Sequence, residues 1–165
     1  MKLQRLMIVA AILLPLSSLA ATKSSNLLNR LASPRTLQYY PDGRDIVCQD
    51  GDKRYNRALY GSYTEFRLET SDRPIFAIYR SKAHKNIRFR LTANAKTTPL
   101  EQTAHTEARY NAGKRVYRLT DDSWGKGVLT ITVLLQPDKE SAIWKFEPQG
   151  MPADSKVEMV MCDIK

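Results

Sequence analysis

The run Val128-Leu129-Thr130-Ile131-Thr132-Val133-Leu134-Leu135 is the part of the chain that decides the fold. It consists of aliphatic and β-branched side chains, which pack well on the pleated surface of a strand. The next run, residues 141–147, alternates between two faces and places Ala142, Trp144 and Phe146 on the apolar one. An alternation with a period of two residues predicts a half-buried strand. The two runs, separated by a turn around Pro137, therefore predict two consecutive strands.

Similar short runs occur along most of the chain after residue 35. Gly, Pro and Asp occupy the turns between them, as in Pro41-Asp42-Gly43 and Asp50-Gly51. Residues 56–63, 81–86 and 97–102 are expected to be loops. The other strands are expected at 36–40, 45–49, 53–55, 65–70, 75–79, 87–91, 106–110, 115–120 and 157–162. About ten short strands at this spacing, without a long helix, predict an all-β fold, an antiparallel β-sandwich.

The first 20 residues form a separate segment. Lys2 and Arg5 precede an apolar run at residues 6–16, and Ser18-Leu19-Ala20 supplies the small residues of a cleavage site before Ala21. This arrangement predicts a cleaved signal peptide. The apolar run is short for a membrane span, so an N-terminal anchor is the less favoured interpretation. We expect an exported protein, periplasmic, at the cell surface or extracellular, with no membrane span after cleavage.

These patterns divide the chain into three segments. Residues 1–20 are the expected signal peptide, residues 21–35 a linker, and residues 36–165 the β-sandwich domain. The chain ends at Lys165, three residues after the apolar part of the last expected strand. From this ending we expect a domain that is either truncated at its C-terminal end or stand-alone.

The chain is basic, with a formal net charge of +9. Without Lys2 and Arg5, 24 Lys and Arg remain against 17 Asp and Glu, which gives +7. A basic exported protein favours anionic partners such as acidic polysaccharides, and export argues against nucleic acid. Solubility through net charge is the simpler explanation of the same excess.

Two cysteines, Cys48 and Cys162, lie in strand-like runs. Export permits a disulfide between them if the two runs are neighbours, whereas free buried thiols are the alternative. The two cysteines and two separated histidines do not have the spacing of a zinc site. We therefore expect no metal and no cofactor.

No catalytic motif stands out. Glycoside hydrolysis needs two carboxylates that face one cavity, and Glu65, Glu69, Asp121 and Asp122 are candidates without a surrounding signature. His84 and His105 lie in polar segments without a nucleophile motif beside them. Whether the chain is an enzyme stays uncertain, and a hydrolase that uses Glu65 with Asp121 or Asp122 is the least favoured function.

Binding residues are easier to identify. Residues 54–67 combine arginines and tyrosines, which hydrogen-bond and stack at recognition surfaces. Residues 73–100 contain no acid, and Arg88 and Arg90 share one strand face that suits an anionic glycan or is simply solvated. Trp124 either stacks on a sugar or closes one end of the core. The candidate interface or glycan-binding residues are Arg54, Asn56, Arg57, Tyr60, Tyr63, Arg67, Arg88, Arg90 and Trp124.

Three segments also carry a family resemblance: residues 54–67, residues 72–79 (Asp-Arg-Pro-Ile-Phe-Ala-Ile-Tyr) and residues 125–130 (Gly-Lys-Gly-Val-Leu-Thr). They resemble the N-terminal β-sandwich domain of unknown function found on large exported bacterial glycoside-hydrolase-like proteins of polysaccharide-utilisation systems. The similarity covers residues 40–160. In that family the sandwich resembles one that precedes an (α/α) toroid catalytic domain, for which this chain has no counterpart. The resemblance therefore implies no catalytic residue here.

Together these observations lead us to expect a non-catalytic exported domain that docks onto a neighbouring or missing catalytic domain, with Arg57 and Tyr60 donating at the interface. A small anionic-glycan-binding module is the alternative, so carbohydrate is the other expected partner. The sequence does not identify the glycan or the oligomeric state.

Overall fold

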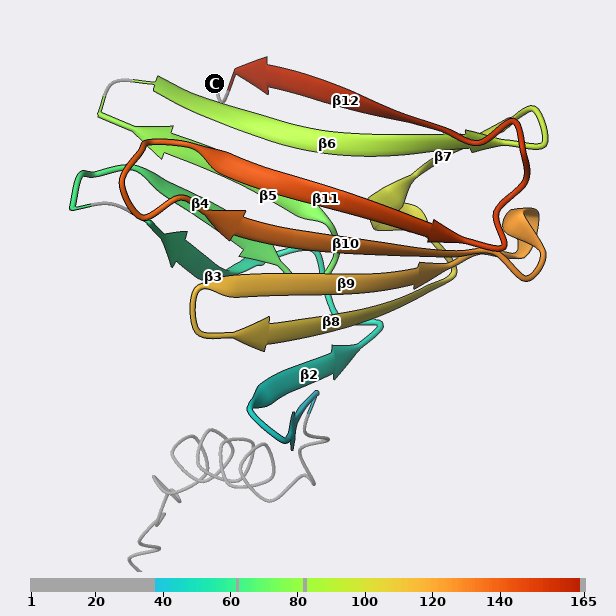
Figure 1. The fold of residues 1–165 in the computed structure, drawn as a ribbon, viewed down its shortest axis with the longest axis horizontal. Helices are drawn as coiled ribbons and strands as arrows, with labels where there is room; N and C mark the ends of the chain where they lie inside the picture. Colours follow the sequence, from blue (N-terminus) through green and yellow to red (C-terminus); the bar gives the residue numbers. More distant parts are fainter. Residues whose placement is uncertain (1–37, 62, 82, 164–165) are drawn as a thin grey trace, which may run out of the picture. The chain divides into compact units, whose positions relative to one another are not determined.

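A computed structural model describes residues 38–61, 63–81 and 83–163. The expected signal peptide, the linker and residues 36 and 37 lie outside the described residues. The described chain is all-β, with two antiparallel sheets and no α-helix (Figure 1). Among the described residues there is no helix with the length and apolar character needed to cross a membrane.

The first sheet has six strands. Their order is β1 (Tyr39–Asp42), β2 (Asp45–Gln49), β8 (His105–Asn111), β9 (Lys114–Thr120), β10 (Val128–Leu135) and β11 (Ala142–Gln149). Two short 3-10 helices, η1 (Leu100–Gln102) and η2 (Asp122–Trp124), lie in the connections before β8 and after β9.

The second sheet also has six strands. Its order is β12 (Lys156–Asp163), β6 (Ala83–Ala93), β5 (Ile75–Arg80), β4 (Arg67–Ser71) and β3 (Tyr55–Tyr60), and β7 (Lys96–Pro99) pairs with the end of β6. All of these pairs are antiparallel.

The two sheets pack face to face around one apolar core. In β10, every second residue from Leu129 to Leu135 is buried, as the sequence predicts for this strand. Phe76 of β5 contacts Tyr117 of β9 and Trp144 of β11, with ring centroids 5.8 and 5.7 Å apart. Phe89 of β6 contacts Phe146 of β11 at 5.0 Å. These contacts place β11 over β6, and they confirm an all-β fold of two packed antiparallel sheets.

Local turns follow the sequence signals where Gly supplies an unusual backbone conformation. Tyr39–Asp42 pairs back onto Asp45–Cys48 around Gly43, which has φ of 60°. A residue without Cβ adopts this left-handed conformation at little cost. The expected turn between two strands is therefore present at Gly43, but Pro41 and Asp42, which were expected in the turn, belong to strand β1.

Three expectations about the strands are wrong. Residues 56–60 belong to strand β3, not to a loop, and β3 pairs with β4. Strand β6 begins at Ala83, within the expected loop at 81–86. Lys96–Pro99 forms the short strand β7, where a loop was expected. The described chain consequently has twelve strands rather than about ten.

Candidate functional site

The recognition segment, residues 54–67, is divided among three environments. Arg54 lies in the loop before β3 and forms an exposed ion pair with Asp52 at 3.3 Å. Asn56 and Arg57 turn toward the space between the sheets, whereas Tyr60 and Arg67 point outward from the second sheet. Tyr63 lies fully exposed in the loop after β3. The structure thus brings only some of these residues together.

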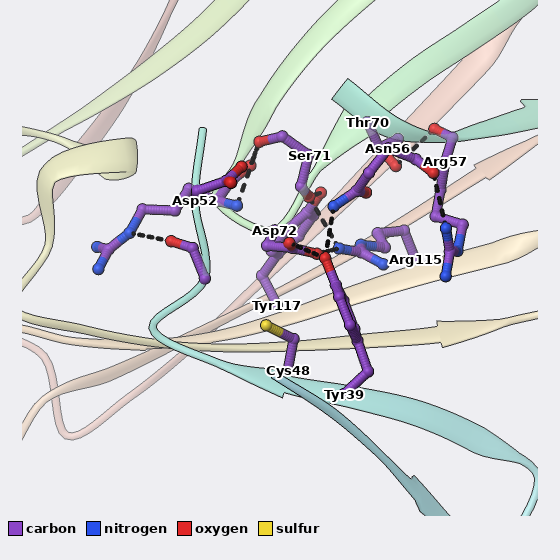
Figure 2. Close-up of polar contacts among 12 residues, drawn as sticks. Tyr39, Cys48, Asp52, Asn56, Arg57, Thr70, Ser71, Asp72, Arg115 and Tyr117 are labelled. Atoms are coloured by element: carbon purple, nitrogen blue, oxygen red, sulfur yellow. Dashed lines mark hydrogen bonds and ion pairs between the residues drawn. The ribbon is translucent and has the colours of Figure 1, made fainter. Parts of the chain in front are cut away.

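Asn56 and Arg57 belong to a polar cluster at the edge of the core (Figure 2). The Asn56 side-chain amide donates to the Tyr39 hydroxyl at 3.0 Å, and the Arg57 guanidinium lies over the rings of Tyr39 and Tyr110. Thr70 donates to the backbone carbonyl of Arg57 at 2.9 Å. These contacts fix β3 against β1, β4 and β8, which gives Arg57 a structural role within the chain.

A buried ion pair lies at the centre of this cluster. The Arg115 guanidinium donates to the Asp72 carboxylate at 2.7 Å, and their side chains are 2% and 1% exposed. Arg115 also donates to the backbone carbonyl of Ser71 at 2.9 Å, and the Tyr39 hydroxyl donates to the second Asp72 oxygen (Figure 2). Buried charges require such partners because both have lost their hydration.

Sequence reasoning missed this pair, although one signal for it exists. The alternation of residues 115–120 places Arg115 on the same strand face as Tyr117 and Leu119, which are buried. An arginine on a core face needs a carboxylate partner. The identity of that partner, 43 residues away in the chain, follows only from the fold.

Tight packing closes the cluster on its other side. A Cβ atom on Gly51 would lie 2.5 Å from the Cβ atom of Asp72 and 2.7 Å from the Cys48 sulfur, so only glycine fits there. Burial raises the pKa of the Cys48 thiol. The cluster is therefore a tightly packed polar contact that connects the two sheets.

The candidate disulfide is wrong, because Cys48 and Cys162 are both free. Cys48 is buried in β2, which is four strands, or about 19 Å, from β11 along the first sheet. Cys162 is exposed in β12 beside β6, near the opposite edge.

The outward-facing residues form an aromatic row across the second sheet, which consists of Tyr60, Arg67, Tyr79 and His84. Tyr60 is opposite Arg67, Arg67 is opposite Tyr79, and Tyr79 is opposite His84 in successive strand pairs. The row therefore crosses β3, β4, β5 and β6 on the face that points away from the core. The sequence identified Tyr60 and Arg67 but not Tyr79 and His84.

Contacts within the aromatic row fix its geometry. The Arg67 guanidinium lies over the Tyr79 ring at 4.3 Å and donates to the Glu69 carboxylate at 2.7 Å. The hydrogen bond to Glu69 raises the pKa of Arg67, which keeps its charge. The rings of Tyr79 and His84 are in contact, with centroids 4.6 Å apart and planes tilted by 51°. Tyr60 is 65% exposed at the β3 end of the row.

Arg88 and Arg90 lie on the same outer face, but both have acidic neighbours. Arg90 pairs with Glu158 of β12 at 2.8 Å, and Arg88 lies 4.0 Å from Glu101. The acid-free interval of the sequence is therefore not acid-free in space, because neighbouring elements supply carboxylates. The argument for an anionic glycan along this strand loses part of its basis.

Trp124 is 2% exposed and belongs to the core cluster. A buried indole cannot stack on a sugar, so the interpretation of Trp124 as a glycan contact is wrong. The alternative, in which Trp124 closes one end of the core, agrees with its position in η2.

The carboxylates considered for catalysis do not meet. Gly61, in the loop that leads to Glu65, packs against Leu135 and Gln136 at one end of β10, whereas Asp121 and Asp122 follow the β9 residue paired with Val128 at the other end. These ends are about 23 Å apart, far beyond the separation that glycosidase carboxylates use. The proposed pairing of Glu65 with Asp121 or Asp122 is wrong.

A groove of about 650 Å³ lies between the loop after β2 and η1. Arg73 lines it and is held by the carbonyls of Gly51 and Thr103, at 3.2 and 2.8 Å. Within the described part of the chain, no group of three or more His, Cys, Asp or Glu side chains is arranged to hold a metal ion.

Comparison with known proteins gives one match. Residues 81–163, which include β6 to β12, match the family model described as "Domain of unknown function (DUF4450)", and this span is 83 of the 165 residues. No curated protein and no solved structure matches the chain.

Proposed function

The chain belongs to the family of the domain of unknown function DUF4450, and from this premise we propose that it is an exported, non-catalytic accessory domain that docks onto a polysaccharide-degrading protein. The observation that carries the proposal is the aromatic row on the outer face of the second sheet. The glycosidase context comes from the resemblance of residues 54–67, 72–79 and 125–130 to domains on such proteins.

The chemistry of the row suits a protein interface. Tyrosine and arginine are over-represented among residues that contribute most to binding, because they combine large apolar area with hydrogen bonding. Arg67 is held in place by Glu69 and Tyr79, so little conformational entropy is lost when a partner covers it. Tyr60 presents an exposed ring beside this fixed guanidinium. Asn56 and Arg57 support the row from beneath by fixing β3.

Replacing Tyr60 tests this function. We expect Tyr60→Ala to weaken binding of the full chain to the polysaccharide-degrading protein onto which it is proposed to dock by about tenfold, or about 1.4 kcal/mol, in calorimetry. Tyr40→Ala is the matched control, because Tyr40 is 43% exposed but belongs to β1 of the first sheet. Equal affinities of the wild type and Tyr60→Ala would contradict docking through the aromatic row.

Glycan binding is the second candidate, supported by the exposed tyrosines and by Arg88 and Arg90 on the same face. Affinity electrophoresis against pectic and sulfated polysaccharides separates the two functions. Retardation that is lost in the Arg88→Ala/Arg90→Ala variant would favour the glycan module. Unchanged mobility of both proteins would exclude it.

A further inference from the structure

At one edge of the sandwich, the two sheets do not end at the same position. Phe89 of β6 contacts Trp144 and Phe146 of β11, with centroids 5.8 and 5.0 Å apart, so β11 lies over β6. The second sheet continues one strand further, to β12, whereas the first sheet ends at β11 (Figure 1). In the described chain, the space beside β11 and above β12 therefore lacks one strand.

This missing position exposes apolar side chains that point toward the core side. Val157, Met159 and Met161 of β12 are directly opposite the buried residues Leu91, Phe89 and Ile87 of β6. Directly opposite residues of an antiparallel pair point to the same face. Met159 and Met161 are nevertheless 55% and 49% exposed, because no strand of the first sheet covers them.

We propose that a second copy of this chain fills the position, so that the protein is a twofold symmetric dimer in which each β12 pairs with the partner's β11. Consider a twofold axis that runs parallel to the strands and lies between the two sheets. It places the partner's β12 in the vacant position of the first sheet, next to β11 and facing β12 of the first copy. The axis preserves strand direction, and β12 runs opposite to β11 within the chain (Figure 1). The new pair is therefore antiparallel, and the same contact occurs twice.

The fold limits this pair to two registers. Phe89 contacts both Trp144 and Phe146 and is directly opposite Met159, so Met159 lies at the level of residue 145. The symmetry operation keeps that level, which brings the partner's Met159 beside this part of β11. If core-facing residues must remain opposite one another, the partner's Met159 faces either Trp144 or Phe146. Opposite Phe146, Glu147 would face the partner's Glu158, so we infer the register in which the partner's Met159 faces Trp144.

The same register matches every neighbouring side chain. On the core side, Phe146 faces the partner's Val157 and Ala142 faces the partner's Met161. The two strips of Val157, Met159 and Met161 then cover each other across the axis, so both exposed methionines become part of one continuous core. Burial of apolar area of this kind drives association.

The outer side is complementary in charge. In this register Lys145 faces the partner's Glu158, and Glu147 faces the partner's Lys156. Ile143 faces the partner's Val160, and these two exposed aliphatic residues, 42% and 40% exposed, cover one another. Opposite charges across a strand pair stabilise it, and the dimer contains four such pairs.

Other pairings of the same edges do not fit. If β11 paired with the partner's β11, each β12 would occupy the space of the partner's β6, because β12 extends one strand beyond β11. If β12 paired with the partner's β12, the four methionines would stay uncovered, since the two β11 strands would be too far apart to close over them. Only the pairing of each β12 with the partner's β11 fills the missing position in both copies.

Charge reversal provides the test. Variant one carries Lys145→Glu with Glu147→Lys, and variant two carries Lys156→Glu with Glu158→Lys. Each reversal keeps the Lys–Glu pair within its own strand, and variant two also removes the Arg90–Glu158 pair. In analytical ultracentrifugation of the full chain at micromolar concentration, we expect a dimer for the wild type. Each variant alone is expected to dissociate at least tenfold more readily, because all four opposed pairs become repulsive.

Mixing the two variants distinguishes charge pairing from simple loss of folding. In the mixed dimer, the reversed β11 of variant one faces the reversed β12 of variant two, and the unchanged strands face each other. We expect the mixture to recover the dimer. A monomeric wild type, or a dimer that neither variant weakens, would overturn the proposal. Failure of the mixture to recover the dimer would overturn this register.

A cross-link tests the register independently. Ser141 faces the partner's Cys162, and both lie on outer faces of opposite sheets within one chain, where they cannot reach each other. Under oxidising conditions, Ser141→Cys is expected to give a covalent dimer through the native Cys162. Lys139→Cys, two residues away, is the control and should cross-link several-fold less.

This dimer uses a surface separate from the aromatic row. A monomeric result would therefore leave the proposed docking function intact, and loss of docking in Tyr60→Ala would leave the dimer intact.

Discussion

Asp72 illustrates at the scale of one residue how the polar cluster constrains the fold. Its two carboxylate oxygens accept hydrogen bonds from Arg115 and Tyr39, which belong to β9 and β1. Arg115 is almost fully buried, so water cannot solvate its guanidinium if the carboxylate is lost. The cost of losing one partner is then the cost of leaving the other charge buried and unpaired.

We therefore expect Asp72→Asn to lower the free energy of unfolding by about 3–5 kcal/mol, measured by urea unfolding with tryptophan fluorescence. Asp52→Asn is the control, because the Asp52–Arg54 pair is exposed and should change stability by less than about 0.5 kcal/mol. Combining Asp72→Asn with Arg115→Met should cost less than the sum of the two single changes. A small effect of Asp72→Asn alone would mean that water or another side chain compensates Arg115.

At the scale of elements, the strands that the sequence predicts correctly are those with regular alternation. Strands β9 and β10 each bury every second residue, and β11 half-buries Ala142, Trp144 and Phe146, so a period of two is visible in the sequence. Strand β3 was missed because its core-facing Arg57 is polar and is held by Tyr39, Tyr110 and Thr70. A register shift between Tyr55 and Arg57 also breaks the period.

The candidate site was less accessible to prediction for a related reason. The sequence marks Tyr60 and Arg67 as recognition residues, but it contains no information on which strands pair. Tyr79 and His84 join the aromatic row only through the register of β4 with β5 and of β5 with β6. The carboxylates that neutralise Arg88 and Arg90 likewise come from distant segments, as Glu101 and Glu158. Side-chain patterns predict elements, whereas pairing decides which side chains meet.

A hydrogen bond of Tyr117 connects strand β9 to the second sheet. The ionisation of Tyr117 can be used to measure the contribution of this buried side chain to stability. The Tyr117 hydroxyl donates to the Ser71 carbonyl at 2.7 Å, and burial raises its pKa from 10.0 to about 12. The folded state therefore favours the neutral phenol. Its contribution is complete below pH 10 and is lost as the pH rises toward about 12, because the unfolded chain ionises first.

We expect the free energy of unfolding to fall by about 2–3 kcal/mol across this range because of Tyr117. Tyr117→Phe should reduce that slope, although at neutral pH it loses about 1 kcal/mol with its hydrogen bond. Urea unfolding at a series of alkaline pH values measures both effects. Tyr63→Phe, fully exposed, is the control and should leave the slope unchanged. A slope that Tyr117→Phe does not alter would contradict the assigned ionisation.

At the scale of the whole molecule, the two proposed surfaces are compatible. The aromatic row crosses β3 to β6 on the outer face of the second sheet, and the dimer contact uses the edges of β11 and β12. The twofold axis lies between the sheets, so the outer faces of the two second sheets point in opposite directions. The dimer would then present two aromatic rows, and attachment at both would strengthen binding to a partner with repeated sites.

Export is the remaining prediction, and it concerns the segment that precedes the described residues. Lys2 and Arg5, the apolar run at 6–16 and the small residues before Ala21 predict cleavage by a signal peptidase. We expect the protein recovered from outside the cytoplasm of a bacterial host to begin at Ala21, as determined by intact mass. Leu13→Arg with Leu14→Arg interrupts the apolar run and should leave the full-length chain in the cytoplasm. Full-length wild type in the membrane fraction would instead identify the segment as an anchor, and the dimer would then form between membrane-bound chains.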